Sequence, residues 1–263
     1  MKVTRITVNT SLRYIIKSSL ISLFHDDVID ETPIRRGKKT ANNIWGNKAS
    51  ILVGDFLLSH AFKLMTDTGS IKALSLLSDT AIEITESEVW QLDLIGKTNI
   101  TIDSYINLIH GKTASLFATS CAVGSYLMDD GDKYYESLYN AGLALGILFQ
   151  ISDDYLDYYA SSSSFGKAIG SDFREKKVTL PLILLLQEVS SDERSVIEDN
   201  MGLENPDIKL IINLMTKYGV QAKAMQIANK YSDDAKDFLK KLPNNEINLT
   251  LQKLVDFMLL RTN

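Results

Sequence analysis

The chain has 263 residues, 45% of them hydrophobic, which is enough to bury a large core in one domain or two small ones. Its formal net charge of -5 argues against a nucleic-acid-binding protein, because such proteins normally carry a basic excess. The single cysteine, Cys121, excludes an intrachain disulfide framework and is typical of a protein in a reducing compartment.

The N-terminal segment shows none of the features of a signal peptide. Residues 1–10 are polar and mixed, and no continuous apolar stretch precedes Leu20. The longest apolar runs, such as 142–151, are shorter than the ~18 residues that a membrane-spanning helix needs. We therefore expect a soluble, cytoplasmic protein without a membrane span.

Proline and apolar spacing predict helices along most of the chain. The four prolines are Pro33, Pro181, Pro206 and Pro243. The chain between Pro33 and Pro181 contains no proline, the residue that breaks a helix because it lacks a backbone N–H. Apolar residues there recur at spacings of three and four, as in Leu58, Phe62 and Met65. No stretch shows the alternation of β-branched residues that indicates a strand. The sequence thus predicts an all-α protein, a single domain of about ten helices.

Segments that contain glycine or asparagine mark where these helices should end. Such residues readily adopt the left-handed conformation that closes a helix. We predict a polar loop over 37–46, helix–helix turns at 69–70, 96–99 and 129–132, and a flexible loop over 161–170. A new helix is expected over 182–189, directly after Pro181.

The first candidate functional stretch is 25–36, which contains Asp26, Asp27 and Asp30. Aspartates at i, i+1 and i+4 share one helical face, where each like-charged pair costs about 0.2–0.5 kcal/mol. A chain that keeps such a cluster either exposes it to solvent or provides it with a cation. Because acidic clusters are common on solvated helix faces, this one alone does not establish a site.

The same spacing recurs at Asp153, Asp154 and Asp157. Each cluster ends an apolar stretch, 20–24 in the first case and 144–151 in the second. Carboxylates beside an apolar wall are costly unless their charge is compensated. Mg²⁺ is commonly held by one or two carboxylates, with waters and substrate phosphates completing its shell. The three histidines lack zinc-ligand spacing, and no Gly-rich nucleotide loop occurs. The two clusters therefore predict metal sites that bind a polyphosphate.

Basic residues lie just beyond the helix ends and the acidic clusters. Any one of them alone would be interpreted as a solvated surface residue. As a set they indicate a diphosphate pocket, and they are Arg35, Arg36, Lys112, Lys167, Lys176 and Lys177.

Five blocks, in order along the chain, carry a resemblance to a known family. They are 25–42, 53–57, 112–117, 149–158 and 177–182. Together with the C-terminal pattern they make the chain from about residue 14 onward resemble the long-chain trans-polyprenyl diphosphate synthases, of octaprenyl or decaprenyl type. The resemblance implies the isoprenoid synthase fold, a helical bundle around a central cavity. It also implies one polyprenyl synthase domain over 1–263, shortened at its N-terminus.

The resemblance further implies a Mg²⁺-dependent prenyltransferase that condenses an allylic diphosphate with isopentenyl diphosphate. Catalytic metal ligands carry over to Asp26, Asp27, Asp30, Asp153, Asp154 and Asp157. Arg35 matches a contact to the allylic diphosphate and Arg36 a contact to isopentenyl diphosphate. Lys112, a catalytic residue, matches a lysine that holds the allylic diphosphate, as do Lys167 and Lys177. Thr113 and Gln150 match polar residues that orient the reacting groups.

The main departure from the family lies before the first motif. Relatives carry further helices there, with a Gly-Lys-Arg segment for isopentenyl diphosphate that this chain lacks. Ser22 and Ile21, four and five positions before the first aspartate, are not aromatic. We therefore expect a medium- or long-chain product, such as a quinone side chain, and a homodimer as in most relatives.

Two alternatives stay open at this point. Because of the shortened start, the chain is also interpreted as a non-catalytic remnant or a regulatory subunit of an active synthase. A terpene cyclase shares the ionisation step, but it explains Arg35-Arg36 and Lys112-Thr113 less well.

Overall fold

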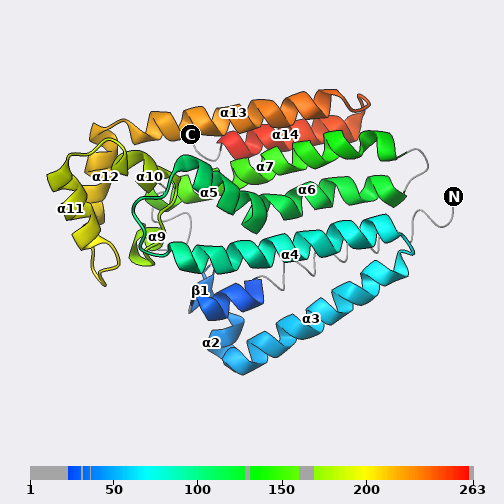
Figure 1. Ribbon diagram of the computed structural model, residues 1–263, viewed down its shortest axis with the longest axis horizontal. Helices are drawn as coiled ribbons and strands as arrows, with labels where there is room; N and C mark the ends of the chain where they lie inside the picture. Colours follow the sequence, from blue (N-terminus) through cyan, green and yellow to red (C-terminus); the bar gives the residue numbers. More distant parts are fainter. Residues whose placement is uncertain (1–22, 31, 36, 128–130, 160–168, 261–263) are drawn as a thin grey trace. The chain divides into compact units, whose positions relative to one another are not determined.

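The computed structural model describes residues 23–30, 32–35, 37–127, 131–159 and 169–260. Within these residues it contains twelve α-helices with both ends described, which confirms the all-α prediction (Figure 1). They are α2 (Ala41–Trp45), α3 (Asn47–Asp67), α4 (Ile71–Leu94), α5 (Ile102–Ile109), α6 (Ser115–Ala122), α7 (Asp132–Tyr159), α9 (Ser171–Arg174), α10 (Leu180–Leu186), α11 (Ser191–Asn200), α12 (Ile208–Lys217), α13 (Val220–Lys240) and α14 (Glu246–Leu260). A π-helix, η1 (His110–Ala114), joins α5 to α6, and a 3-10 helix, η2 (Val123–Leu127), follows α6.

The chain divides into two compact units. The first draws its described residues from Met1–Asp79 and Thr119–Glu136. The second draws them from Thr80–Ala118, Ser137–Ala160 and Ala168–Asn263. The single domain over 1–263 stays a prediction.

The described part of the first unit begins with the helical residues 23–29 and a small hairpin. Strand β1 (Ile34–Arg35) pairs antiparallel with β2 (Lys38–Lys39), and α2 follows directly. The predicted polar loop over 37–46 is therefore wrong in part, because β2 and α2 lie within it. The sequence did not predict α2 because this helix has only five residues and buries none of them, so it leaves no apolar periodicity in the sequence.

The core of the first unit is small. Its buried members come from α3, α4 and η2, and they are Ala61, Met65, Ala73, Leu77 and Val123. Among the described helices, α3 alone is long and apolar enough to cross a membrane, with a mean hydropathy of 1.2 and 22% of that stretch buried. Length and composition are the whole basis of this finding. Asp55 and Lys63 lie within the helix.

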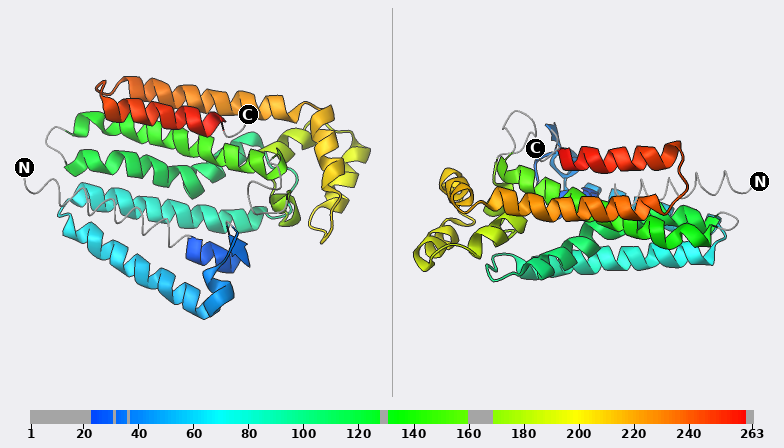
Figure 2. Two further views of the ribbon diagram at one scale, coloured as in Figure 1. Left: turned by 180° about the vertical axis from the view of Figure 1, so that it is seen from behind. Right: turned by 90° about the horizontal axis from the view of Figure 1, so that it is seen from above.

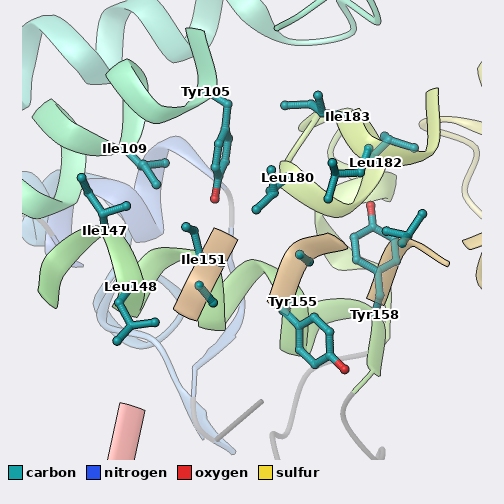
Figure 3. Packing of buried hydrophobic residues seen from close by; sticks show 14 of the residues in the cluster. Tyr105, Ile109, Ile147, Leu148, Ile151, Tyr155, Tyr158, Leu180, Leu182 and Ile183 are labelled. Atoms are coloured by element: carbon teal, nitrogen blue, oxygen red, sulfur yellow. The ribbon is translucent and has the colours of Figure 1, made fainter. Parts of the chain in front are cut away.

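The second unit holds the larger core, built around α5, α7 and α10. Every residue of α10 is buried, from Leu180 to Leu186. Figure 3 shows Ile109, Leu148 and Ile151 packed in this cluster, and each fully buried large side chain contributes roughly 1.5–3 kcal/mol. The prediction of a new helix near Pro181 is confirmed, although α10 begins one residue before that proline.

Two further features fix the helices of this unit. Helix α14 returns alongside α13, and α12 lies near the start of α13 (Figure 2). Gly146 on α7 allows η1 to approach closely. A Cβ at this position would lie 2.6 Å from the Cα of Ala114.

Candidate active site

The first aspartate motif lies in the first unit, on the helical residues 23–29 and the turn that follows. Asp27 is buried, whereas Asp26 and Asp30 are half-buried. The Nε of Arg35 donates a 2.8 Å hydrogen bond to Oδ1 of Asp27. The Nδ2 of Asn42 donates to the Asp27 backbone oxygen at 2.8 Å. The hairpin thus returns Arg35 to the motif and gives the buried carboxylate a guanidinium partner.

A close approach to α3 holds this motif in place. Gly54 lies against His25, and a Cβ at position 54 would be 2.2 Å from the His25 Nε2. The hydroxyl of Ser50 donates to the Phe24 backbone oxygen at 3.1 Å. The predicted ligand of isopentenyl diphosphate, Arg36, lies outside the described residues.

The second motif lies on α7 in the second unit. Asp154 is buried and accepts two hydrogen bonds: from the Tyr105 hydroxyl at 2.6 Å and from the Gln150 Nε2 at 2.7 Å. The Thr113 hydroxyl in turn donates to Gln150 Oε1 at 2.8 Å. Figure 3 shows Tyr105 reaching from α5 with its hydroxyl toward α7. Asp153, the preceding residue, is exposed.

The electrostatics of this motif show an excess of negative charge. Burial raises the pKa of Asp154 to about 7, against the hydrogen bonds from Tyr105 and Gln150, and the charges of Asp153 and Asp157 add to the effect. Burial also raises the pKa of Asp172 well above its usual range, aided by Asp157 and Asp154. Clustered carboxylate oxygens of this kind are the donors that a hard divalent cation prefers.

The third aspartate of this motif has a different environment. Oδ1 of Asp157 accepts from the Ser171 backbone N–H at 3.1 Å and from the Ser171 hydroxyl at 2.6 Å. Its Oδ2 accepts from the Asp172 backbone N–H at 3.1 Å. The side chain therefore joins α7 to the start of α9.

Lys112 projects from η1, and π turns often occur at functional sites. Its Nζ donates to Glu88 Oε2 at 2.9 Å and to Gln91 Oε1 at 2.6 Å. Neither partner was predicted from the sequence, although both lie on one face of α4 at a spacing of three. Gly111 permits the approach to α4, since a Cβ there would be 2.0 Å from the Ser87 Oγ.

A pocket in the second unit collects several of these side chains. Lys177 is among them, and its Nζ lies 2.8 Å from Glu175 Oε2. The polar lining residues are Gln91, Tyr105, Lys112, Gln150, Asp154, Asp172, Lys177 and Thr179. The apolar wall includes Leu94, Ile95, Ile100, Leu108, Ile109 and Val178. Lys167, also predicted to hold diphosphate, lies outside the described residues.

The structure does not test the predicted set of six metal ligands. Within the described ranges, no group of three or more His, Cys, Asp or Glu side chains is arranged to hold a metal ion. Tyr105 and Asp172 are site residues that the sequence did not indicate. They come from α5 and α9, and only packing against α7 brings them to Asp154.

An all-helical fold with two such aspartate motifs, one beside an arginine and one beside a lysine-lined pocket, defines the class of isoprenoid diphosphate synthases. The chain belongs to the polyprenyl synthetase family, whose model matches residues 16–218. It is accordingly an enzyme, a trans-prenyltransferase, which confirms the family and the fold that the resemblance implied.

Individual proteins support this assignment. Octaprenyl diphosphate synthase of Escherichia coli (strain K12) is 37% identical over 227 residues, which cover 85% of this chain and 70% of the relative. A decaprenyl diphosphate synthase from Rhodobacter capsulatus is similar in structure, with a TM-score of 0.90, 34% identity and coverage of 99% of this chain and 84% of that one. A polyprenyl synthase from Caulobacter crescentus CB15, complexed with calcium and isoprenyl diphosphate, matches with a TM-score of 0.88, 34% identity and the same coverage.

Proposed function

We propose that this prenyltransferase is Mg²⁺-dependent and condenses an allylic diphosphate with isopentenyl diphosphate to give a medium- or long-chain all-trans polyprenyl diphosphate. The pocket of the second unit carries the proposal. Its lining combines Lys112 and Lys177 with the carboxylates of Asp154 and Asp172 and with aliphatic side chains. Such a site fits a ligand with an anionic head and an apolar chain.

Mg²⁺ needs only one or two carboxylates, with waters and substrate phosphates completing its shell, and the aspartates of the two motifs can provide these ligands. We assign this role to Asp26, Asp27 and Asp30 in the first unit, and to Asp153 and Asp154 in the second. Burial raises the pKa of Asp154, and a bound cation would favour its ionised form. When bound, Mg²⁺ supplies Lewis-acid neutralisation of the departing diphosphate. The calcium in the similar Caulobacter crescentus protein supports a divalent ion.

The chain's own residues account for the other requirements of the reaction. Lys112 and Lys177 bind the allylic diphosphate in the pocket, and Arg35 provides a further cation in the first unit. The allylic C–O bond breaks, the double bond of isopentenyl diphosphate attacks the resulting cation, and loss of a proton leaves the chain five carbons longer. Fixed charges stabilise the leaving group, while the aliphatic wall keeps water from the cation. Thr113 and Gln150, already hydrogen-bonded to each other, orient the reacting groups.

The finer parts of the proposal concern product and assembly. The octaprenyl and decaprenyl synthases to which the chain is similar support a long product, which suits a quinone side chain made in the cytoplasm. We also propose a homodimer. Ile82, Val89 and Leu92 on α4 are 56%, 63% and 54% exposed, and their spacing puts them on one helical face. An apolar stripe of this kind is typical of a protein interface.

The test is a prenyl-transfer assay with purified protein, labelled isopentenyl diphosphate and allylic primers of increasing length. Mg²⁺-dependent formation of long-chain product, lost with a chelator and in Asp154→Ala, is the expected result. Cyclic hydrocarbon without isopentenyl diphosphate, or no product with any primer, would contradict it. Sedimentation of the wild-type protein tests the dimer. A Val89→Glu variant should sediment as a monomer.

A further inference from the structure

The N-terminus of α9 is capped by a side chain from another helix. Gly170, the residue before α9, has a left-handed backbone and provides no side-chain cap. The first N–H groups of a helix lack partners inside it and need an acceptor. Asp157 on α7 provides that acceptor for Ser171 and Asp172, as its three hydrogen bonds show.

The backbone of Asp157 strengthens the same connection. Its carbonyl oxygen accepts from the Gly170 N–H at 2.8 Å. Three consecutive backbone N–H groups, at 170, 171 and 172, therefore bond to one residue of α7. Gly170 also packs tightly on its other side, where a Cβ would lie 2.6 Å from Ile208 Cδ1. The segment has little freedom to shift while these bonds hold.

The segment that Asp157 holds carries two residues of the pocket. Asp172 is the second residue of α9, and Lys177 follows three residues after the helix. The Lys177 N–H donates to the Asp172 carbonyl oxygen at 2.8 Å, so the two positions are coupled through the backbone. Phe173 between them is fully buried and anchors the helix to the core.

We propose that Asp157 is a positioning residue, which fixes the segment 169–178 so that Asp172 and Lys177 line the pocket, and that it is not a metal ligand. This differs from the role that the family resemblance implies for the third aspartate. Its neighbours on α7 contrast with it, since Asp153 is exposed and Asp154 accepts its hydrogen bonds from the pocket side chains of Tyr105 and Gln150. The proposal rests on the proposed function only in taking the pocket as the diphosphate site.

The first test measures amide hydrogen exchange in the metal-free protein, which needs no activity. Asp157→Ala should make exchange in 169–178 faster, and Ser171→Ala, which removes one of the three side-chain bonds, should do so to a smaller extent. Asp153→Ala is the matched control, with an equal change on the same helix and no expected effect on this segment. Unchanged exchange in Asp157→Ala would overturn the proposal. If Asp157→Ala does not fold, Asp157→Asn replaces it. The Nδ2 of asparagine is a donor and cannot accept the hydrogen bond from the Asp172 N–H. Unchanged exchange in 169–178 of this variant, relative to Asp153→Ala, would likewise overturn the proposal.

The second test separates positioning from metal binding, with inorganic pyrophosphate and Mg²⁺ as probes in calorimetry. Asp157→Ala and Ser171→Ala should weaken pyrophosphate binding, by about fivefold for the loss of a helix cap, and leave the Mg²⁺ midpoint unchanged. Asp153→Ala should raise the Mg²⁺ midpoint. A raised Mg²⁺ midpoint in Asp157→Ala, together with wild-type pyrophosphate binding by Ser171→Ala, would identify Asp157 as a metal ligand and refute the proposal. Failure of the wild type to bind either probe would refute the proposed function instead, while the exchange result would still decide the role of Asp157.

Discussion

Replacing Asp154 with asparagine should stabilise the metal-free protein toward neutral pH while strongly reducing prenyl transfer. The wild-type carboxyl is buried among Asp153, Asp157 and Asp172, so its ionisation in the folded protein is unfavourable. An amide has the same shape and no charge. The hydrogen-bond network accommodates it if the Gln150 amide rotates, because Thr113 can then accept and the Tyr105 hydroxyl keeps its acceptor.

The magnitude follows from the pKa of Asp154, which burial raises from 3.8 to about 7. A folded-state pKa above the unfolded one means that the native protein binds the extra proton between these values. Its stabilising effect is therefore present at low pH and is lost as the pH rises through that window. The slope is about 1.4 kcal/mol per pH unit. Because this slope falls by half as the pH reaches the folded-state pKa, the wild type should lose about 2 kcal/mol of unfolding free energy relative to Asp154→Asn between about pH 5 and about pH 7.

Urea denaturation followed by circular dichroism, in buffers that contain a chelator, measures this difference at several pH values. Asp153→Asn is the matched control, because it removes an exposed carboxylate from the adjacent position and should retain most of the wild-type pH slope. Mg²⁺-dependent prenyl transfer by the same three proteins provides the functional comparison. If the stability difference between Asp154→Asn and wild type stays flat over this range, Asp154 is not a neutral buried carboxyl and the reasoning fails.

Three further predictions concern other parts of the second unit. Glu193 bonds to Lys217 and Tyr218, which lowers its pKa to about 2, so stability should fall as the pH drops below the usual value of 4.5 toward 2. Glu193→Gln should remove this loss of stability when the unfolding free energy is measured across acid pH values. An unchanged pH dependence in the variant would contradict the role of Glu193. Lys176 has a positive φ of 57°, a strain of about 1–2 kcal/mol that glycine relieves at an entropic cost of about 0.5–1 kcal/mol. Lys176→Gly should therefore raise the unfolding free energy by up to about 1 kcal/mol, and a clear loss in denaturation would refute the strain. Gly146→Ala should destabilise by about 1–3 kcal/mol through overpacking against η1, whereas an unchanged melting temperature would show that the helices can separate.

The sequence predicted those features that depend on local spacing. The period of three to four indicated the helices, and the repeated i, i+1, i+4 pattern singled out Asp153 and Asp154 as candidate ligands. It did not indicate Glu88 or Tyr105, because their roles come from contacts with Lys112 and Asp154, which are 24 and 49 positions away. It also missed α2, which is too short and too exposed to show a period.

The π turn at η1 could not be predicted from the sequence either, because its residues could equally form an ordinary α-helix. It matters for any attempt to transplant this site. A π turn contains an extra residue relative to an α turn, so an aligned α-helix falls out of phase by about 100° past η1. A design that threads 102–122 onto one uniform helix would keep every identity and still point either Lys112 or the residues after it in the wrong direction. Sequence identity in this block is therefore a poor guide to transferable geometry, and the insertion itself should be treated as part of the motif.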